Sequence, residues 1–183
     1  MADPAVVRAA VENGPMGSND VHTLLVIRHA KSDWSTPAAD IDRPINARGR
    51  RQAPFVGRWI AEQIGPIDVA VVSVACRAEQ TWTAIAAELD EQPIVQQEQA
   101  AYTDSGGRLV RLIEQLRPEQ RVAAIVSHNP AVEELVEHLT GASVVLKTSA
   151  LAVIDLPDWS DLGECCGVLR AVGRPADGPL PWL

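Results

Sequence analysis

The sequence has few cysteines and no long apolar run. Among its 183 residues the only cysteines are Cys76, Cys165 and Cys166. An odd count with two adjacent cysteines does not fit a disulfide framework, and no CxxC pair offers the ligand spacing of a zinc site. No apolar run approaches the roughly 18 residues that a membrane-spanning helix needs. We therefore expect reduced thiols in a cytoplasmic protein that does not bind a membrane.

The sequence also lacks an excess of positive charge. Sixteen basic residues stand against 24 acidic ones, which gives a net charge of −8. Nucleic-acid-binding proteins usually carry a basic face, so we expect no nucleic-acid partner. Only Lys31 and Lys147 are lysines, and the other basic residues are arginines. Genome base composition is the simplest reason for most of these arginines, but a few can act as fork-shaped anion binders, which their positions must identify.

The length corresponds to about one domain. The first 20 residues lack the basic start and apolar core of a secretory signal. We expect residues 1–20 to be a flexible N-terminal extension and residues 21–183 to form the domain. The sequence contains no internal repeat and no low-complexity segment.

From residue 23 onward, short apolar strands alternate with amphipathic helices. We expect strands over 23–27, 68–73, about 94–95, 121–127, 150–156 and 168–172, and helices over 46–64, 77–89, 107–116 and 130–140. This alternation predicts a three-layer α/β/α sandwich on a mostly parallel central sheet, with the last two strands at an edge or antiparallel. Ligands of such sheets bind at the carboxyl ends of the strands, so the residues directly after each strand are the candidates for function.

Basic side chains follow three of the expected strands. His29 comes directly after the first strand, and neutral imidazole at such a point can attack phosphorus. The adjacent Arg28 can clamp phosphate oxygens, and Arg77 lies near a helix start, where anions are already favoured. His128 follows the fourth strand. Each of these residues alone is as easily structural, for example a capping histidine or a surface arginine, but their combination is specific.

Taken in order, the motifs resemble those of the histidine phosphatase superfamily, whose fold is called phosphoglycerate-mutase-like. The three matching segments are RHAKSDWS (28–35), SVACRAEQT (73–81) and VSHNP (126–130). Within the superfamily the chain is most similar to the small SixA-type phosphohistidine phosphatases, on the segments DRPINARG (42–49) and LKTSALAVIDL (146–156).

The resemblance implies a role for each matched residue. His29 would be the nucleophile and would become phosphorylated, while Arg28, Arg77 and His128 would complete the phosphate pocket. Ser35 stands where the mutase branch has asparagine, and it can donate one hydrogen bond to phosphate. Water would then hydrolyse the phosphohistidine intermediate. The resemblance implies no metal and no cofactor, and the sequence shows no carboxylate cluster typical of a magnesium site.

The chain departs from the superfamily at its proton donor. The acid-phosphatase branch has an acid directly after its second histidine, whereas this chain has Asn129. Glu98, expected in the loop after the third strand, is the best candidate for a possible proton donor, and Asp33 is a weaker one. An alkoxide leaving group needs a proton in the transition state, whereas an imidazole leaving group needs less help. A pocket without a strong acid therefore favours phosphohistidine.

Three functions are consistent with these observations. The first is a metal-independent phosphatase that works through a phosphohistidine enzyme intermediate and acts on protein phosphohistidine. The second is a phosphomonoesterase for small phosphorylated metabolites or nucleotides, with Glu98 as its acid. The third is a non-catalytic phosphate-binding module. The partner is accordingly a phosphorylated protein or a small phosphorylated substrate, and the sequence does not set the oligomeric state.

Overall fold

The computed structural model describes residues 21–35 and 37–183, and these residues build one six-stranded sheet. In chain order the strands are β1 (His22–Arg28), β2 (Val69–Ser73), β3 (Ile94–Glu98), β4 (Val122–Ser127), β5 (Leu151–Leu156) and β6 (Val168–Gly173). Their order across the sheet is β3-β2-β4-β1-β5-β6. The first four strands are parallel, and β5 and β6 are antiparallel to their neighbours. The predicted N-terminal extension, residues 1–20, lies outside the described residues.

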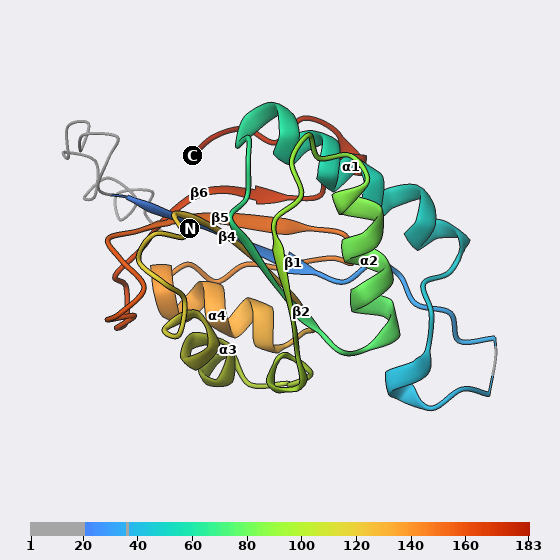
Figure 1. Cartoon of the computed structure of the whole chain (residues 1–183). Helices are drawn as coiled ribbons and strands as arrows, with labels where there is room; N and C mark the ends of the chain where they lie inside the picture. The colour runs from blue at the N-terminus through green and yellow to red at the C-terminus, as the bar shows by residue number, and fades with distance from the viewer. Residues whose placement is uncertain (1–20, 36) are drawn as a thin grey trace, which may run out of the picture.

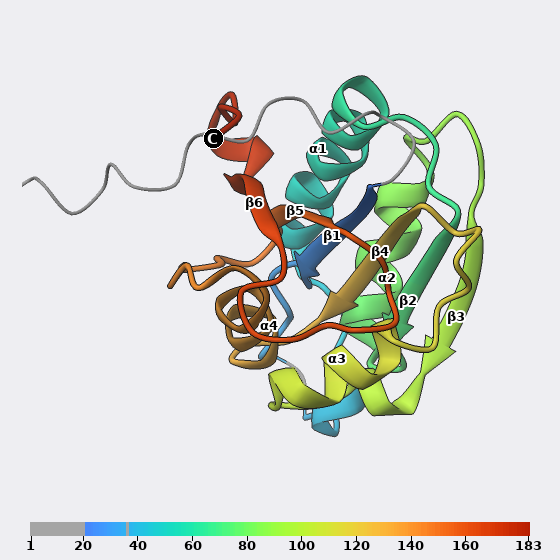
Figure 2. The same cartoon turned by 90° about the vertical axis from the view of Figure 1, so that its left-hand side faces the viewer.

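Two pairs of helices cover the two faces of the sheet (Figures 1 and 2). One face packs against α1 (Ala47–Gln63) and α2 (Cys76–Ala86), and the other against α3 (Gly106–Ile113) and α4 (Ala131–Thr140). The described 3-10 helices are η2 (Asp40–Asp42) in the β1–α1 connection, η3 (Gln99–Ala101) after β3 and η4 (Pro175–Asp177) after β6. The predicted three-layer α/β/α sandwich with a mostly parallel sheet is therefore confirmed. None of the described helices combines the length and apolar character needed to cross a bilayer.

The strand sequences explain why both faces are covered. In β1, Leu24 and Val26 pack in the α3–α4 core, whereas Leu25 and Ile27 pack in the α1–α2 core. Each of these four side chains is at most 1% exposed. Side chains alternate between the faces of a strand, so a strand buried on both faces reads as a continuous apolar run.

Local sequence signals place the helix ends. The Asn46 side chain caps α1 by accepting a hydrogen bond from the Gly49 amide at 3.0 Å, as expected for an asparagine N-cap. Gly141 ends α4 in the left-handed region, at φ 71°, which costs glycine little. The helix predicted over 107–116 ends earlier, at Ile113. The prediction extended too far because Leu116, in the turn after the helix, also packs in the core and continues the apolar pattern.

The topology brings several chain segments to one edge of the sheet. The four parallel strands end at this edge, and because β5 and β6 are antiparallel, β5 begins there and β6 ends there. The light-blue segment that contains η2 extends beyond this edge in Figure 1. Residues from the β1–α1 connection, the β2–α2 connection, the loop before β5 and the end of β6 therefore meet although they are distant in sequence.

Candidate active site

The end of β1 is held in place by neighbouring strands and by α2. The His29 amide donates to the Ser127 carbonyl at 3.0 Å, at the end of β4. The Ala30 amide donates to Oγ1 of Thr81 at 2.8 Å, and this buried hydroxyl donates in turn to the Arg77 carbonyl at 2.5 Å. Thr81 thus links the first motif to the second. This link fixes the spacing between His29 and the start of α2.

The His29 ring is buried and neutral. Its side chain is 8% exposed, and Nδ1 lies 2.7 Å from the Ala30 carbonyl oxygen, which can only accept. The ring proton therefore sits on Nδ1, and Nε2 carries a free lone pair. Burial is the main reason that the pKa of His29 falls from 6.5 to about 3, and the positive charges of Arg77 and Arg28 also lower it. At neutral pH, Nε2 is therefore available as a nucleophile.

Arg77 points its guanidinium at this nitrogen. Its Nε donates to Nε2 of His29 at 3.3 Å. Its Nη2 donates to Oδ2 of Asp40 at 2.9 Å, and its Nη1 donates to the Asp40 carbonyl at 2.5 Å. Arg77 is 5% exposed, so the ion pair is largely shielded on the arginine side. A planar donor group fixed at three points next to the nucleophile is suited to a tetrahedral oxyanion.

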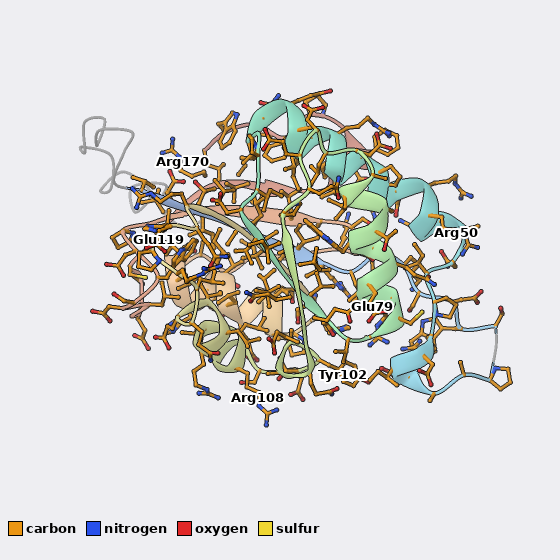
Figure 3. The ribbon with its side chains drawn as sticks, in the orientation of Figure 1. Arg50, Glu79, Tyr102, Arg108, Glu119 and Arg170 are labelled. Carbon is orange, nitrogen blue, oxygen red and sulfur yellow. The ribbon has the colours of Figure 1, made fainter. Side chains whose placement is uncertain are left out.

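Asp40 and Tyr102 belong to this cluster, and sequence reasoning did not find them. The Tyr102 hydroxyl donates to Oδ2 of Asp40 at 2.6 Å, and Arg43 pairs with Oδ1. These hydrogen bonds hold the pKa of Asp40 well below its usual range, so Asp40 is a carboxylate and not a proton donor. Arg43 also lies under the exposed Trp34 ring, 3.5 Å from its centroid. Figure 3 labels Tyr102 at this edge of the molecule.

His128 packs beside His29. The two ring centroids are 4.9 Å apart, and the Tyr102 ring meets His128 edge-on at 5.3 Å. Oγ of Ser73 accepts from the Ala75 amide at 3.3 Å and lies 2.8 Å from Nε2 of His128, so we infer that its hydroxyl donates to Nε2. The ring proton then lies on Nδ1, which is buried without a hydrogen-bond partner among the described residues. A buried donor of this kind calls for a ligand oxygen.

Burial and neighbouring charge also keep His128 neutral. Burial is the largest cause that lowers its pKa, from 6.5 to about 4, followed by the positive charge of Arg77. Arg28 adds a third cation at the site. Its Nη1 donates to the Leu146 carbonyl at 2.7 Å, and its Nε is buried without a partner in the described chain. The structure therefore brings together Arg28, His29, Arg77 and His128, the four residues predicted to form the phosphate pocket.

Two other predicted site residues do not contact these four. Ser35 is exposed, and both its amide and its hydroxyl donate to Oδ1 of Asp33, at 2.8 and 2.7 Å. Glu98 is the last residue of β3, paired with Ser73 in register, and not part of a loop as expected. β3 is an edge strand that is only partly buried, so its sequence is largely polar. A polar sequence has no apolar pattern from which the end of the strand can be predicted.

No metal-ligand cluster accompanies the site. Within residues 21–35 and 37–183, no three or more His, Cys, Asp or Glu side chains are grouped so that they could hold a metal ion. The charged groups around His29 are instead arginines. The arrangement is a neutral imidazole among guanidinium groups, and it is suited to hold a phosphoryl group next to a nitrogen nucleophile.

Comparisons with known proteins find similar sequences and similar folds. The family profile described as "Histidine phosphatase superfamily (branch 1)" matches residues 24–101. The uncharacterized protein Rv1276c of Mycobacterium tuberculosis is 28% identical over 155 residues, which cover 78% of this chain and 96% of that protein.

Solved structures share the fold. The protein histidine phosphatase SixA, complexed with tungstate, superposes with a TM-score of 0.74 at 23% identity, covering 85% of this chain and 98% of that one. A chain from Nakamurella multipartitia, proposed to be a phosphohistidine phosphatase SixA, gives a TM-score of 0.75 at 24% identity, covering 85% and 96%. The chain is therefore similar to branch 1 of the histidine phosphatase superfamily over residues 24–101, and it shares its fold with these solved structures.

Proposed function

We propose that this protein is a phosphohistidine phosphatase that acts on protein phosphohistidine through a phosphorylated His29. The observation that carries the proposal is the neutral His29 ring, whose unprotonated Nε2 accepts a hydrogen bond from Nε of Arg77 at 3.3 Å. In this proposal residues 21–183 form the catalytic domain. The three cysteines are free thiols, which supports a cytoplasmic location.

In the first step, Nε2 of His29 attacks the phosphorus atom and the bond to the leaving group breaks. Arg77 turns its Nε hydrogen bond from Nε2 to a phosphoryl oxygen, while Arg28 and Nδ1 of His128 donate to the other oxygens. The two guanidinium groups neutralise the charge that develops on the phosphoryl group, and neutral His128 adds a hydrogen bond; most of the catalysis of phosphoryl transfer lies in such interactions. Tungstate in the similar SixA structure is an oxyanion of the kind that such a pocket holds.

In the second step, water attacks phosphorus, the bond to Nε2 breaks, and phosphate leaves. The pocket works without a metal ion in this scheme, since Arg28 and Arg77 supply the positive charge. This second step returns His29 to the neutral ring that its burial favours.

The leaving group identifies the substrate class. The carboxyl group nearest to Arg77 is Asp40, which is ionised and bound to two arginines and a tyrosine, so it has no proton to donate. Glu98, the candidate acid, is half-buried at the end of β3, and its side chain makes no hydrogen bond or ion pair with a described residue. A site in which no carboxyl group is positioned to donate a proton favours an imidazole leaving group over an alkoxide.

Turnover of two substrates side by side tests this proposal. One is a protein or peptide that carries phosphohistidine, and the other is glycerol phosphate, both with EDTA present. We expect fast phosphate release from phosphohistidine and little from glycerol phosphate. Comparable rates would show a competent general acid and a metabolite phosphatase, whereas tight phosphate binding without turnover of either substrate would show a non-catalytic binding module.

A further inference from the structure

A cavity lined by basic side chains adjoins the phosphate pocket. It measures about 270 Å³ and is lined by Arg28, Lys31, Arg48, Lys147, Thr148 and Arg174. We call this set the basic pocket. Its members come from the last residue of β1, the β1–α1 connection, the first turn of α1, the loop before β5 and the residue after β6. They meet because β5 begins and β6 ends at the edge where β1 ends.

The composition of the basic pocket stands out from that of the chain. The whole sequence carries a net charge of −8 and has only two lysines, Lys31 and Lys147, and both line this cavity. Three of the 14 arginines join them. Cations concentrated at one point of an acidic protein raise the local concentration of anions there.

Internal carboxylates compensate only part of this charge. The pKa of Asp177 is lowered, first by its hydrogen bond from Arg174 and also by the positive charges of Lys147 and Arg48, so this carboxylate lies near the basic pocket. Arg174 pairs with Asp177 at 2.7 Å. Among the described residues, no carboxylate lies within ion-pair distance of Lys31, Arg48 or Lys147. The Nε atoms of Arg28 and Arg174 are also buried without a hydrogen-bond partner in the described chain, so two donors at the wall of the cavity lack an acceptor. Such donors cost free energy unless an acceptor reaches them.

The basic pocket is continuous with the catalytic site through Arg28. This side chain lines the cavity, and its Nη1 donates to the carbonyl of Leu146, the residue before Lys147. Lys31 lies two residues after His29 in the chain. An anion in the basic pocket would therefore lie beside the phosphoryl group on His29 without replacing it.

We propose that the basic pocket is a second anion-binding subsite, which holds a carboxylate or phosphate group carried by the substrate next to the phosphoryl group that is removed. This inference rests on the proposed phosphatase function. The shared chemistry has two sources: an acidic side chain near phosphohistidine in a protein, or a second phosphate on a small molecule. The subsite selects substrates with two neighbouring anionic groups.

Binding of phosphonates tests the subsite without any turnover. The probes are alkane diphosphonates of increasing chain length, each compared by calorimetry with the alkyl monophosphonate of the same length. We expect the best diphosphonate to bind roughly tenfold more tightly than its monophosphonate, because it gains charge-assisted hydrogen bonds. Equal affinities at every length would overturn the subsite and leave the phosphatase proposal standing. Failure of every phosphonate to bind would instead contradict the phosphate pocket itself.

Two matched arginine variants show whether the tighter binding of the diphosphonate depends on the basic pocket. Arg48→Gln removes an exposed cation of the basic pocket, and Arg108→Gln removes an exposed cation on α3, labelled away from the sheet in Figure 3. The diphosphonate advantage should fall about threefold to tenfold in Arg48→Gln and stay unchanged in Arg108→Gln. Equal losses would show that general charge, and not the subsite, attracts the ligand.

The two lysines provide a second readout. Since Lys31 and Lys147 are the only lysines, acetylation of lysine followed by mass spectrometry reports on this cavity alone. A bound diphosphonate should slow acetylation of both lysines more than the monophosphonate does. Equal acetylation with either ligand would contradict the subsite.

Peptides decide between the two sources of the anion. A phosphohistidine peptide with flanking glutamates is compared with its glutamine counterpart, on the wild type and on Lys147→Gln. If the anion comes from a protein, the glutamate peptide has a severalfold lower KM on the wild type, and this advantage shrinks in the variant. If only the diphosphonates show a Lys147-dependent gain, the source is a second phosphate on a small molecule.

Discussion

The basic side chains on the two sides of His29 differ in whether they are paired with a carboxylate. Toward β2, Arg77 and Arg43 are both paired with Asp40, and Tyr102 adds a hydrogen bond to the same carboxylate. Toward β5 and β6, Lys31, Arg48 and Lys147 line a cavity without such a partner among the described residues. The first side is a closed network and the second is open.

This difference indicates two tasks for cations in one site. A guanidinium that must face the nucleophile needs a fixed orientation, and an internal carboxylate supplies it. A cation that must receive a group of the incoming substrate has to be free, because an internal partner would compete with that group. In the proposed function, the paired side would serve the chemical step and the open side would serve recognition.

The largest expected effect comes from the residue between the two sides. His29→Ala removes the nucleophile and should lower kcat by about 10⁴-fold or more, by analogy with other nucleophile deletions. Steady-state release of phosphate from phosphohistidine measures the loss. Because His29 lies at a strand end, circular dichroism should show an intact fold. Full activity in the variant would show that another group attacks phosphorus.

Loss of the paired arginine should have the next largest effect. Arg77→Ala leaves the transferring phosphoryl group under-neutralised, and kcat should fall by about 10²–10³-fold. Arg108→Ala, an exposed arginine on α3, is the control and should retain wild-type kcat. A small loss at Arg77, equal to that at Arg108, would remove Arg77 from the chemical step.

Removing the charge of Asp40 while keeping Arg77 tests what the ion pair between them contributes. Asp40→Asn keeps the shape of the side chain but takes away the charge that orients Arg77, so kcat should fall roughly tenfold while KM changes little. Asp42→Asn, an exposed neighbour in η2, is the matched control. A rise in activity in Asp40→Asn would mean that Asp40 competes with phosphate for Arg77 and does not position it.

Acid should destabilise the fold through the buried histidines. The pKa of His29 is about 3 and that of His128 about 4 in the folded protein, below the unfolded value of 6.5. As the pH falls from 6.5 toward these values, the unfolded chain takes up protons that the folded chain does not, so stability falls. Thermal unfolding from pH 7 downward should show a decreasing Tm. His29→Ala should weaken this dependence, and an unchanged slope would contradict the low pKa.

The smallest effect is expected at Glu98. Glu98→Gln should change turnover of phosphohistidine by less than about twofold, since imidazole leaves with little help from an acid. Any residual activity on glycerol phosphate should fall more strongly. Parallel assays of the two substrates measure the ratio, and equal losses on both would contradict the leaving-group argument.

Much of this architecture can be predicted from the sequence because the strands are buried on both faces. Continuous apolar runs identify β1, β2 and β4, and their ends mark the places where His29, Arg77 and His128 follow. The position of each residue relative to a strand end can be predicted from the neighbouring sequence alone. Its proximity to the others then follows from the rule that parallel strands end at one edge.

The network around the site could not be predicted in this way. Asp40 and Tyr102 lie in connections without apolar periodicity, and their meeting depends on how two loops pack over α2. The basic pocket likewise combines Arg48 and Arg174, which only the antiparallel return of β6 brings together. The two lysines were the one sequence signal of this pocket, because their scarcity sets them apart.

Trapping the intermediate tests the central claim most directly. The enzyme is mixed with substrate carrying radiolabelled phosphate, quenched in base within the first turnover and digested, and the labelled peptide is sequenced. Our account predicts an acid-labile, base-stable label on His29, formed with EDTA present and absent in His29→Ala. A label on another residue, or turnover with no label on the enzyme under conditions that preserve phosphohistidine, would contradict it.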